Sequence, residues 1–129
     1  MNWSRNIFLF DAMGAATTGA VHLLLLAPNY IYVGVAHAVL MTLGFVAMGF
    51  CMFSWYSWLT WPRGLRAKLL IIAMANALFC ISTLGIMSIY SAAIPKLVII
   101  YWVLEAAIIV AIVIAELSIR KRVGISASG

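Results

Sequence analysis

Residues 101–122 read "YWVLEAAIIVAIVIAELSIRKR", and this stretch decides the fold. Its body is almost entirely apolar and is long enough to cross the hydrocarbon core of a bilayer, which takes about 20 residues of helix. The basic triplet at residues 120–122 follows directly, as is typical where a helix leaves the membrane on the cytoplasmic side. Carboxylates are costly in lipid, so Glu105 and Glu116 predict that one face of this helix lies against other helices.

The composition of the whole chain agrees with a membrane location. Of its 129 residues, 67% are hydrophobic and 9% are charged, whereas about a quarter of the residues of a soluble domain are charged. The net charge of +5 lies in short clusters beside apolar runs, which is a topology signal and argues against nucleic acid as a partner. Cys51 and Cys80 lie inside apolar runs and form no CxxC motif. We therefore expect the lipid bilayer as the surroundings of the protein.

Four apolar runs predict four membrane spans, at about 7–27, 31–55, 69–89 and 97–119, followed by a frayed tail at 120–129. Asp11 interrupts the first run and no cleavage site follows, so we interpret this run as a span and not as a signal peptide. Short turns at 27–30 and 90–96 require their flanking helices to be antiparallel neighbours. The expected fold is all-α: a polytopic membrane protein with an antiparallel four-transmembrane-helix bundle, forming a single transmembrane domain over residues 1–129.

The basic residues predict the orientation of this bundle. Only Lys96 falls on one side of the four-span arrangement, and the other side carries Arg5, Arg63, Arg66, Lys68, Arg120, Lys121 and Arg122. By the positive-inside rule, both termini are expected in the cytoplasm. The cluster from Arg63 onward is interpreted first as a topology determinant, with binding of anionic lipid headgroups or a cytoplasmic partner as the alternative. Aromatic residues should mark the two interfaces: Trp3, Trp55, Trp58 and Trp61 on the inner side and Tyr30, Tyr32 and Tyr90 on the outer side.

Polar residues inside the spans predict two layers. Asp11 and His22 are eleven residues apart, as are Glu105 and Glu116, so each pair shares one helix face. Counting about 1.5 Å of rise per residue gives the depth of each polar group. The outer layer is expected to hold His22, His37, Thr83 and Glu105, and the inner layer Asp11, Asn76 and Glu116. The inner acids are expected to snorkel or to pair with Arg5, Arg120 or Arg122.

The outer layer has several interpretations. It is either a hydrogen-bonded layer that fixes helix register, a proton relay, a metal site of His22, His37 and Glu105, or a bis-histidine haem site. No local ligand spacing supports the metal or the haem, so no cofactor is the leading expectation.

Three runs carry a family resemblance: "IFLFDAMGAATTGAV" (7–21), "IIAMANALFCISTLGIM" (71–87) and "YWVLEAAIIVAIVIAELSI" (101–119). Together they resemble a group of uncharacterised small four-span bacterial integral membrane proteins. The matching polar positions are Asp11, Asn76, Cys80, Glu105 and Glu116. The resemblance implies a four-span fold in a bacterial inner membrane and gives weight to the acids, but it implies no activity. The run "GVAHAVL" departs from the group, so His37 is not part of the resemblance.

Three functions follow from these observations. The leading hypothesis is a binding or accessory module that works as a homo-oligomer or as a subunit of a larger membrane complex. The second is a small proton- or cation-coupled transporter or channel that uses Glu105 with His22, and Asp11 with Glu116 as the inner vestibule. The third is a metal- or haem-binding membrane protein that uses His22, His37 and Glu105. Because the chain offers no nucleophile–base pair beyond the histidines, an enzyme is not expected.

Overall fold

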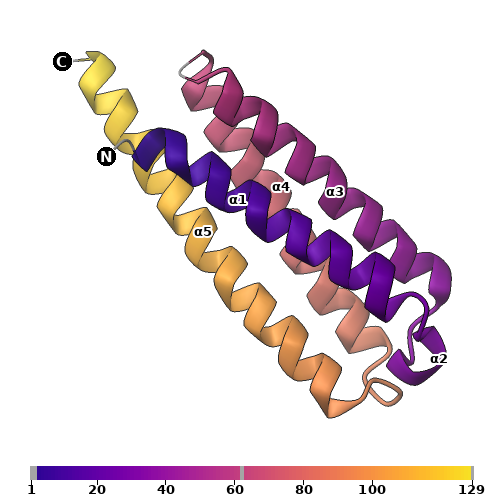
Figure 1. The fold of residues 1–129 in the computed structure, drawn as a ribbon. Helices are drawn as coiled ribbons and strands as arrows, with labels where there is room; N and C mark the ends of the chain where they lie inside the picture. The colour runs from indigo at the N-terminus through magenta and orange to yellow at the C-terminus, as the bar shows by residue number, and fades with distance from the viewer. Residues whose placement is uncertain (1–2, 62, 129) are drawn as a thin grey trace.

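The protein is a bundle of long helices (Figure 1). The computed structural model describes the backbone of residues 3–61 and 63–128 and the side chains of residues 4–61 and 63–123. Its elements are α1 (Trp3–Ala20), which continues as the π-helix η1 (Val21–Leu26), then α2 (Tyr30–Val33), α3 (His37–Leu59), α4 (Leu65–Ile89) and α5 (Lys96–Ser128). Four of the helices are long and apolar enough to cross a membrane, so the predicted all-α membrane architecture is confirmed. The side chain of Trp3, assigned to the inner aromatic belt, lies outside the described residues.

Two helix bounds differ from the prediction. The second span begins at His37 and not near residue 31, because the left-handed Gly34 (φ 80°) ends α2 before α3 starts. A Cβ on Gly34 would lie 2.4 Å from the carbonyl oxygen of Ala93, so only glycine lets this turn pack against the α4–α5 connection. The last helix also continues beyond the predicted span end at residue 119, since α5 runs to Ser128. Arg and Lys are good helix formers and extend α5 beyond its apolar part.

The four long helices associate as two close pairs. α1 packs mainly against α3, and α4 mainly against α5, whereas α1 touches α5 and α3 touches α4 over fewer residues. Glycines allow the close approach of α1 and α3: a Cβ on Gly44 would lie 2.5 Å from Cγ of Leu23, and one on Gly19 would lie 2.6 Å from Sδ of Met48. Small residues at helix contacts are common where lipid removes the usual hydrophobic drive for association.

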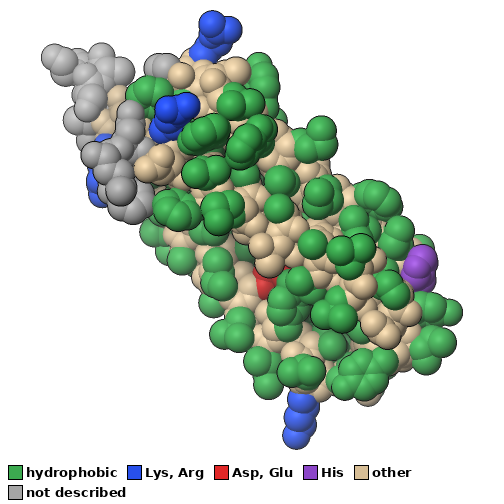
Figure 2. All heavy atoms as spheres, viewed as in Figure 1, with side chains coloured by type: hydrophobic (Ala, Val, Ile, Leu, Met, Phe, Trp, Pro, Cys, Tyr) green, Lys and Arg blue, Asp and Glu red, His purple; other side chains and the backbone are tan. Residues whose placement is uncertain are grey.

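The polar ends and apolar sides of the molecule fit a membrane-embedded bundle. Figure 1 places both termini at one end of the bundle and α2 with the α4–α5 connection at the other. Figure 2 shows Lys and Arg side chains near the two ends and hydrophobic side chains over the face between them. At the terminal end, the Arg5 guanidinium lies 4.5 Å from the centroid of the Trp58 ring, and Trp61 Nε1 donates to the Ser4 hydroxyl at 3.1 Å. Arginine stacked on an indole suits a membrane interface.

Candidate functional site

A buried polar cluster takes one side chain from each long helix, and we call it the four-helix cluster. It consists of Asp11 (α1), Ser54 (α3), Asn76 (α4) and Glu116 (α5), all of them buried. Asn76 Nδ2 donates to Asp11 Oδ1 at 2.6 Å and to Glu116 Oε1 at 3.4 Å, and the Ser54 hydroxyl donates to Asp11 Oδ2. The structure therefore brings together the three residues of the predicted inner layer. Ser54 was missed, although it lies in the last two turns of α3 and bonds Asp11.

The acids of the four-helix cluster do not pair with arginine, so that prediction is wrong. Arg5 Nε donates to the backbone oxygen of Trp58, and Arg120 Nε donates to the backbone oxygen of Arg66. The interfacial aromatic and backbone groups of neighbouring helices satisfy these guanidinium groups before they reach the buried carboxyls. Within the described side chains no Lys or Arg contacts Asp11 or Glu116, and Glu116 Oε2 is buried without a hydrogen-bond partner.

Charge balance follows from this geometry. The Asp11 and Glu116 carboxyl groups share the amide of Asn76 inside an apolar bundle. Two anions bonded to one amide would repel each other in a medium of low dielectric constant. At least one positive charge, either a bonded proton or a bound cation, must therefore accompany the pair.

His22 is buried with both ring nitrogens engaged. Trp102 Nε1 donates to His22 Nε2 at 3.3 Å, and His22 Nδ1 lies 2.8 Å from the backbone oxygen of Thr18. Because Nε2 accepts, Nδ1 carries the hydrogen and donates to Thr18, which assigns the neutral ring. The ring also stacks on Trp102 at a centroid distance of 6.2 Å and an interplanar angle of 17°. His22 is thus a satisfied core group and not the partner of Glu105.

Neither His37 nor Thr83 forms a hydrogen bond with Glu105, so the predicted outer residues are not joined as one hydrogen-bonded layer. His37 is exposed at the start of α3, where its ring lies 5.4 Å from that of Tyr30. The break at Gly34 is the reason, because it makes His37 the first residue of α3 instead of placing it a turn or more inside the helix. Thr83 is buried and donates to the backbone oxygen of Phe79 at 2.9 Å.

The predicted metal ligands consequently do not converge. No three His, Cys, Asp or Glu side chains lie close enough to hold a metal ion in the part of the chain that the structure describes. The bis-histidine haem geometry is not formed either, since His22 is enclosed by Thr18 and Trp102 while His37 is at the surface.

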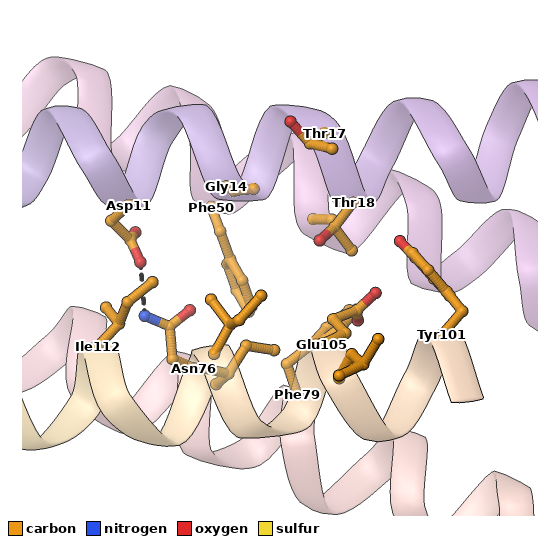
Figure 3. A pocket seen from close by; sticks show the side chains of 15 residues that line it. Asp11, Gly14, Thr17, Thr18, Phe50, Asn76, Phe79, Tyr101, Glu105 and Ile112 are labelled. Atoms are coloured by element: carbon orange, nitrogen blue, oxygen red, sulfur yellow. Dashed lines mark hydrogen bonds between the residues drawn. The ribbon is translucent and has the colours of Figure 1, made fainter. Parts of the chain in front are cut away.

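Glu105 has a different environment from every other acid. Its side chain is only 8% exposed, yet neither carboxylate oxygen has a hydrogen-bond partner. It lies on the wall of a cavity of about 340 Å³ between the two helix pairs. Figure 3 shows the Thr18 and Tyr101 hydroxyls pointing into the same part of this cavity from α1 and α5. A buried polar group without a partner is costly and in native structures usually marks a functional position.

The same cavity reaches the four-helix cluster. Asp11 and Asn76 line its other end, as Figure 3 shows, so one space joins the two acidic sites. The wall between them is apolar and includes Phe50, Phe79 and Ile108. The space exists because α1 contributes small residues here: a Cβ added to Gly14 would meet nothing within 4 Å. All three acids of the chain therefore line this cavity or bond to a residue that does.

Comparison with protein-family models, with curated proteins and with solved structures finds no match for this chain. The resemblance to small four-span bacterial membrane proteins stays a prediction.

Proposed function

We propose that the protein is a small membrane transporter that exchanges protons for a positively charged cargo at Glu105. The observation that carries the proposal is the Glu105 carboxylate, which is buried, lines the cavity beside the Tyr101 hydroxyl and has no hydrogen-bond partner among the described side chains. Ionisable groups inside membrane spans commonly mark ion and proton pathways, because their desolvation is tolerated only where function requires it.

The coupling follows from charge. In an apolar cavity a lone carboxylate is stable only when a proton or a cation neutralises it. One carboxylate accommodates one positive charge, so the proton and the cargo compete for Glu105. Binding of cargo breaks the O–H bond of the protonated side chain and releases the proton, and departure of the cargo requires a proton to return. This competition is sufficient to link the two movements.

The four-helix cluster supplies a second site at which protons bind. Asp11 lies in the same cavity as Glu105, and Asn76 connects Asp11 to Glu116. Glu116 lies eleven residues further along α5, roughly 16 Å closer to the terminal end of the bundle. We assign the cluster as the route by which protons enter the cavity from that end. His22 has no part in this route, because both of its nitrogens are engaged.

Exchange in vesicles tests the proposal. Purified protein is reconstituted into vesicles with an acidic lumen and a trapped pH-sensitive dye, and Na⁺, K⁺ or an organic ammonium ion is added outside. If a cation enters in exchange for protons, the lumen becomes alkaline. Wild type should respond to at least one cation, Glu105→Gln should respond to none, and His37→Gln, changed at an exposed site, should behave as wild type. If no cation moves protons in the wild type, the proposal is wrong.

The same preparations test the accessory-module hypothesis. A wild-type protein without exchange, combined with a Glu105→Gln variant that changes its oligomeric state in detergent, would favour a structural role for Glu105 in an assembly.

A further inference from the structure

We infer that the cargo is a hydrophobic organic cation: a single ammonium-type charge on an apolar, preferably aromatic, body. This inference rests on the proposed function, and it concerns the shape and lining of the cavity beside Glu105. An inorganic cation is the competing occupant.

The cavity has the size and chemistry of a small-molecule site. Its volume of about 340 Å³ falls in the range of about 300–1,000 Å³ that is usual for ligand pockets, which are mostly apolar with a few polar groups. Three aromatic rings line it, those of Phe50, Phe79 and Tyr101. Aromatic faces attract cations, and the attraction is strongest for weakly hydrated ones such as substituted ammonium ions.

The end of the cavity at Glu105 carries one acidic group, which favours a ligand with a single positive charge. No Lys or Arg is among the residues that line it, and Glu105 is the single acid beside Tyr101. An inorganic cation needs several oxygen ligands in its first shell. Among the described residues that line this end of the cavity, Thr18 and Tyr101 point their hydroxyls toward the same space as the Glu105 carboxylate (Figure 3). An ammonium ion that carries its own apolar substituents is satisfied by one carboxylate and the surrounding rings.

A molecule of this kind can enter the cavity from the bilayer, between α1 and α5. Figure 2 shows a small area of acidic side-chain surface on a face rich in hydrophobic side chains, on the side where α1 and α5 lie in Figure 1. Of the three acids, Glu105 is the most exposed. α1 and α5 contact each other over few residues, and Gly14 presents no side chain to the gap. A molecule with an apolar body concentrates in the membrane and reaches Glu105 sideways between these helices.

Titration in the cavity is restricted to a few groups. Its lining includes Asp11 from α1 and Tyr101 and Glu105 from α5, whereas α3 and α4 contribute no titratable side chain to it. His22 lies behind Tyr101, at a ring distance of 6.4 Å, and is held by Thr18 and Trp102. A permanently charged cargo carries no proton of its own, so any proton released on binding comes from the protein, and from Glu105 before Asp11, which already accepts two hydrogen bonds.

Benzyltrimethylammonium and its neutral carbon isostere, neopentylbenzene, form a matched pair of probes. Binding of each to the protein in lipid nanodiscs is measured by calorimetry in two buffers of different ionisation enthalpy, with empty nanodiscs as the reference for partition into lipid. Wild type should bind the ammonium ion more tightly than the isostere and release about one proton per ion bound. Glu105→Gln should weaken ammonium binding roughly 30-fold or more and abolish proton release, because it removes one partner of a buried charge pair. His37→Gln should match wild type.

A second variant tests the volume of the cavity without changing its charge. Gly14→Leu should occupy part of the cavity, since Gly14 lines it and a Cβ there meets no neighbour within 4 Å. It should fold with an unchanged helical spectrum and should weaken ammonium binding at least tenfold.

Three outcomes would overturn the inference: equal binding of the charged and neutral probes, ammonium binding that survives Glu105→Gln, or a Glu105-dependent exchange that Na⁺ or K⁺ drives in vesicles while the ammonium ion neither binds nor exchanges. The last result removes only the cargo class, whereas absence of exchange with every cation removes the proposed function as well.

Discussion

The four-helix cluster and the Glu105 site lie at two ends of the same cavity. They differ in the number of hydrogen bonds that their carboxyl groups accept. Asp11 accepts hydrogen bonds from both Asn76 and Ser54, and Glu116 accepts one from Asn76 through Oε1 while its Oε2 has no partner, so four helices converge on a few polar atoms. Glu105 is nearly as buried but receives no hydrogen bond. A hydrogen-bonded buried group specifies how helices pack, while a buried group without hydrogen bonds carries an uncompensated desolvation cost that a ligand can remove. Substitutions at the two sites should therefore change the free energy of unfolding in opposite directions.

Asn76→Leu should have the largest effect on stability. The change leaves Asp11 and Glu116 without their shared donor while both stay buried, and removal of a partner from buried groups that can carry charge costs about 3 kcal/mol. The free energy of unfolding, measured by circular dichroism during denaturant titration in mixed micelles, should fall by that amount. Asn29→Leu is the control, because Asn29 is exposed and its amide donates to the backbone oxygen of Leu25 within the same turn. A loss no larger than that of Asn29→Leu would show that the cluster does not hold the helices together.

Glu105→Leu should move stability in the opposite direction. Replacing an unpartnered buried carboxyl with an apolar side chain removes its desolvation cost, and we expect a gain of about 1.5 kcal/mol in the free energy of unfolding. The same titration measures it. A loss of stability comparable to that of Asn76→Leu would mean that Glu105 has a structural partner and would break the contrast between the two sites.

Ser54→Ala should cost about 1 kcal/mol, since Asp11 keeps the bond from Asn76 but loses the one from Ser54. Ser57→Ala is a matched control on the same helix, because the Ser57 hydroxyl donates to the backbone oxygen of Phe53 and reaches no other helix. Unfolding of the two variants should be compared in the same micelles. Equal losses would contradict the role of Ser54 in joining α3 to α1.

His37→Gln should change stability least, by less than about 0.5 kcal/mol, because His37 is exposed at the first residue of α3. A thermal unfolding midpoint within error of wild type is the expected measurement. A marked shift would indicate that the ring contact with Tyr30 fixes the position of the α2 segment.

The fold and three of the four residues of the four-helix cluster were predictable, because both depend on helices that run without interruption. Apolar length gives the spans, and constant rise and rotation carry Asp11, Asn76 and Glu116 to one level. The prediction failed at His37 because the left-handed turn at Gly34 adds a separate short helix that hydropathy does not distinguish from the start of a span.

The environment of His22 was less accessible to sequence reasoning. Its indole partner, Trp102, belongs to an apolar run in which tryptophan counts as one more hydrophobic residue. From Val21 onward the helix is a π-helix, so a constant 100° step no longer gives the direction of each side chain. The cavity was also missed, because it depends on the absence of side-chain volume at Gly14 and on the loose contact between α1 and α5.

The bond between Asn76 and Asp11 spans 65 residues of chain, and this separation affects how the protein is made. At a synthesis rate of about 5–20 residues per second, Asn76 is polymerised roughly 3–13 s after Asp11. During that interval α1 carries a carboxyl group into the membrane before either α4 or α5 exists. The first helix must therefore wait beside the insertion machinery or enter the lipid with Asp11 as the neutral acid. In either case the bond between α1 and α4 forms only after the second and third long helices have been made.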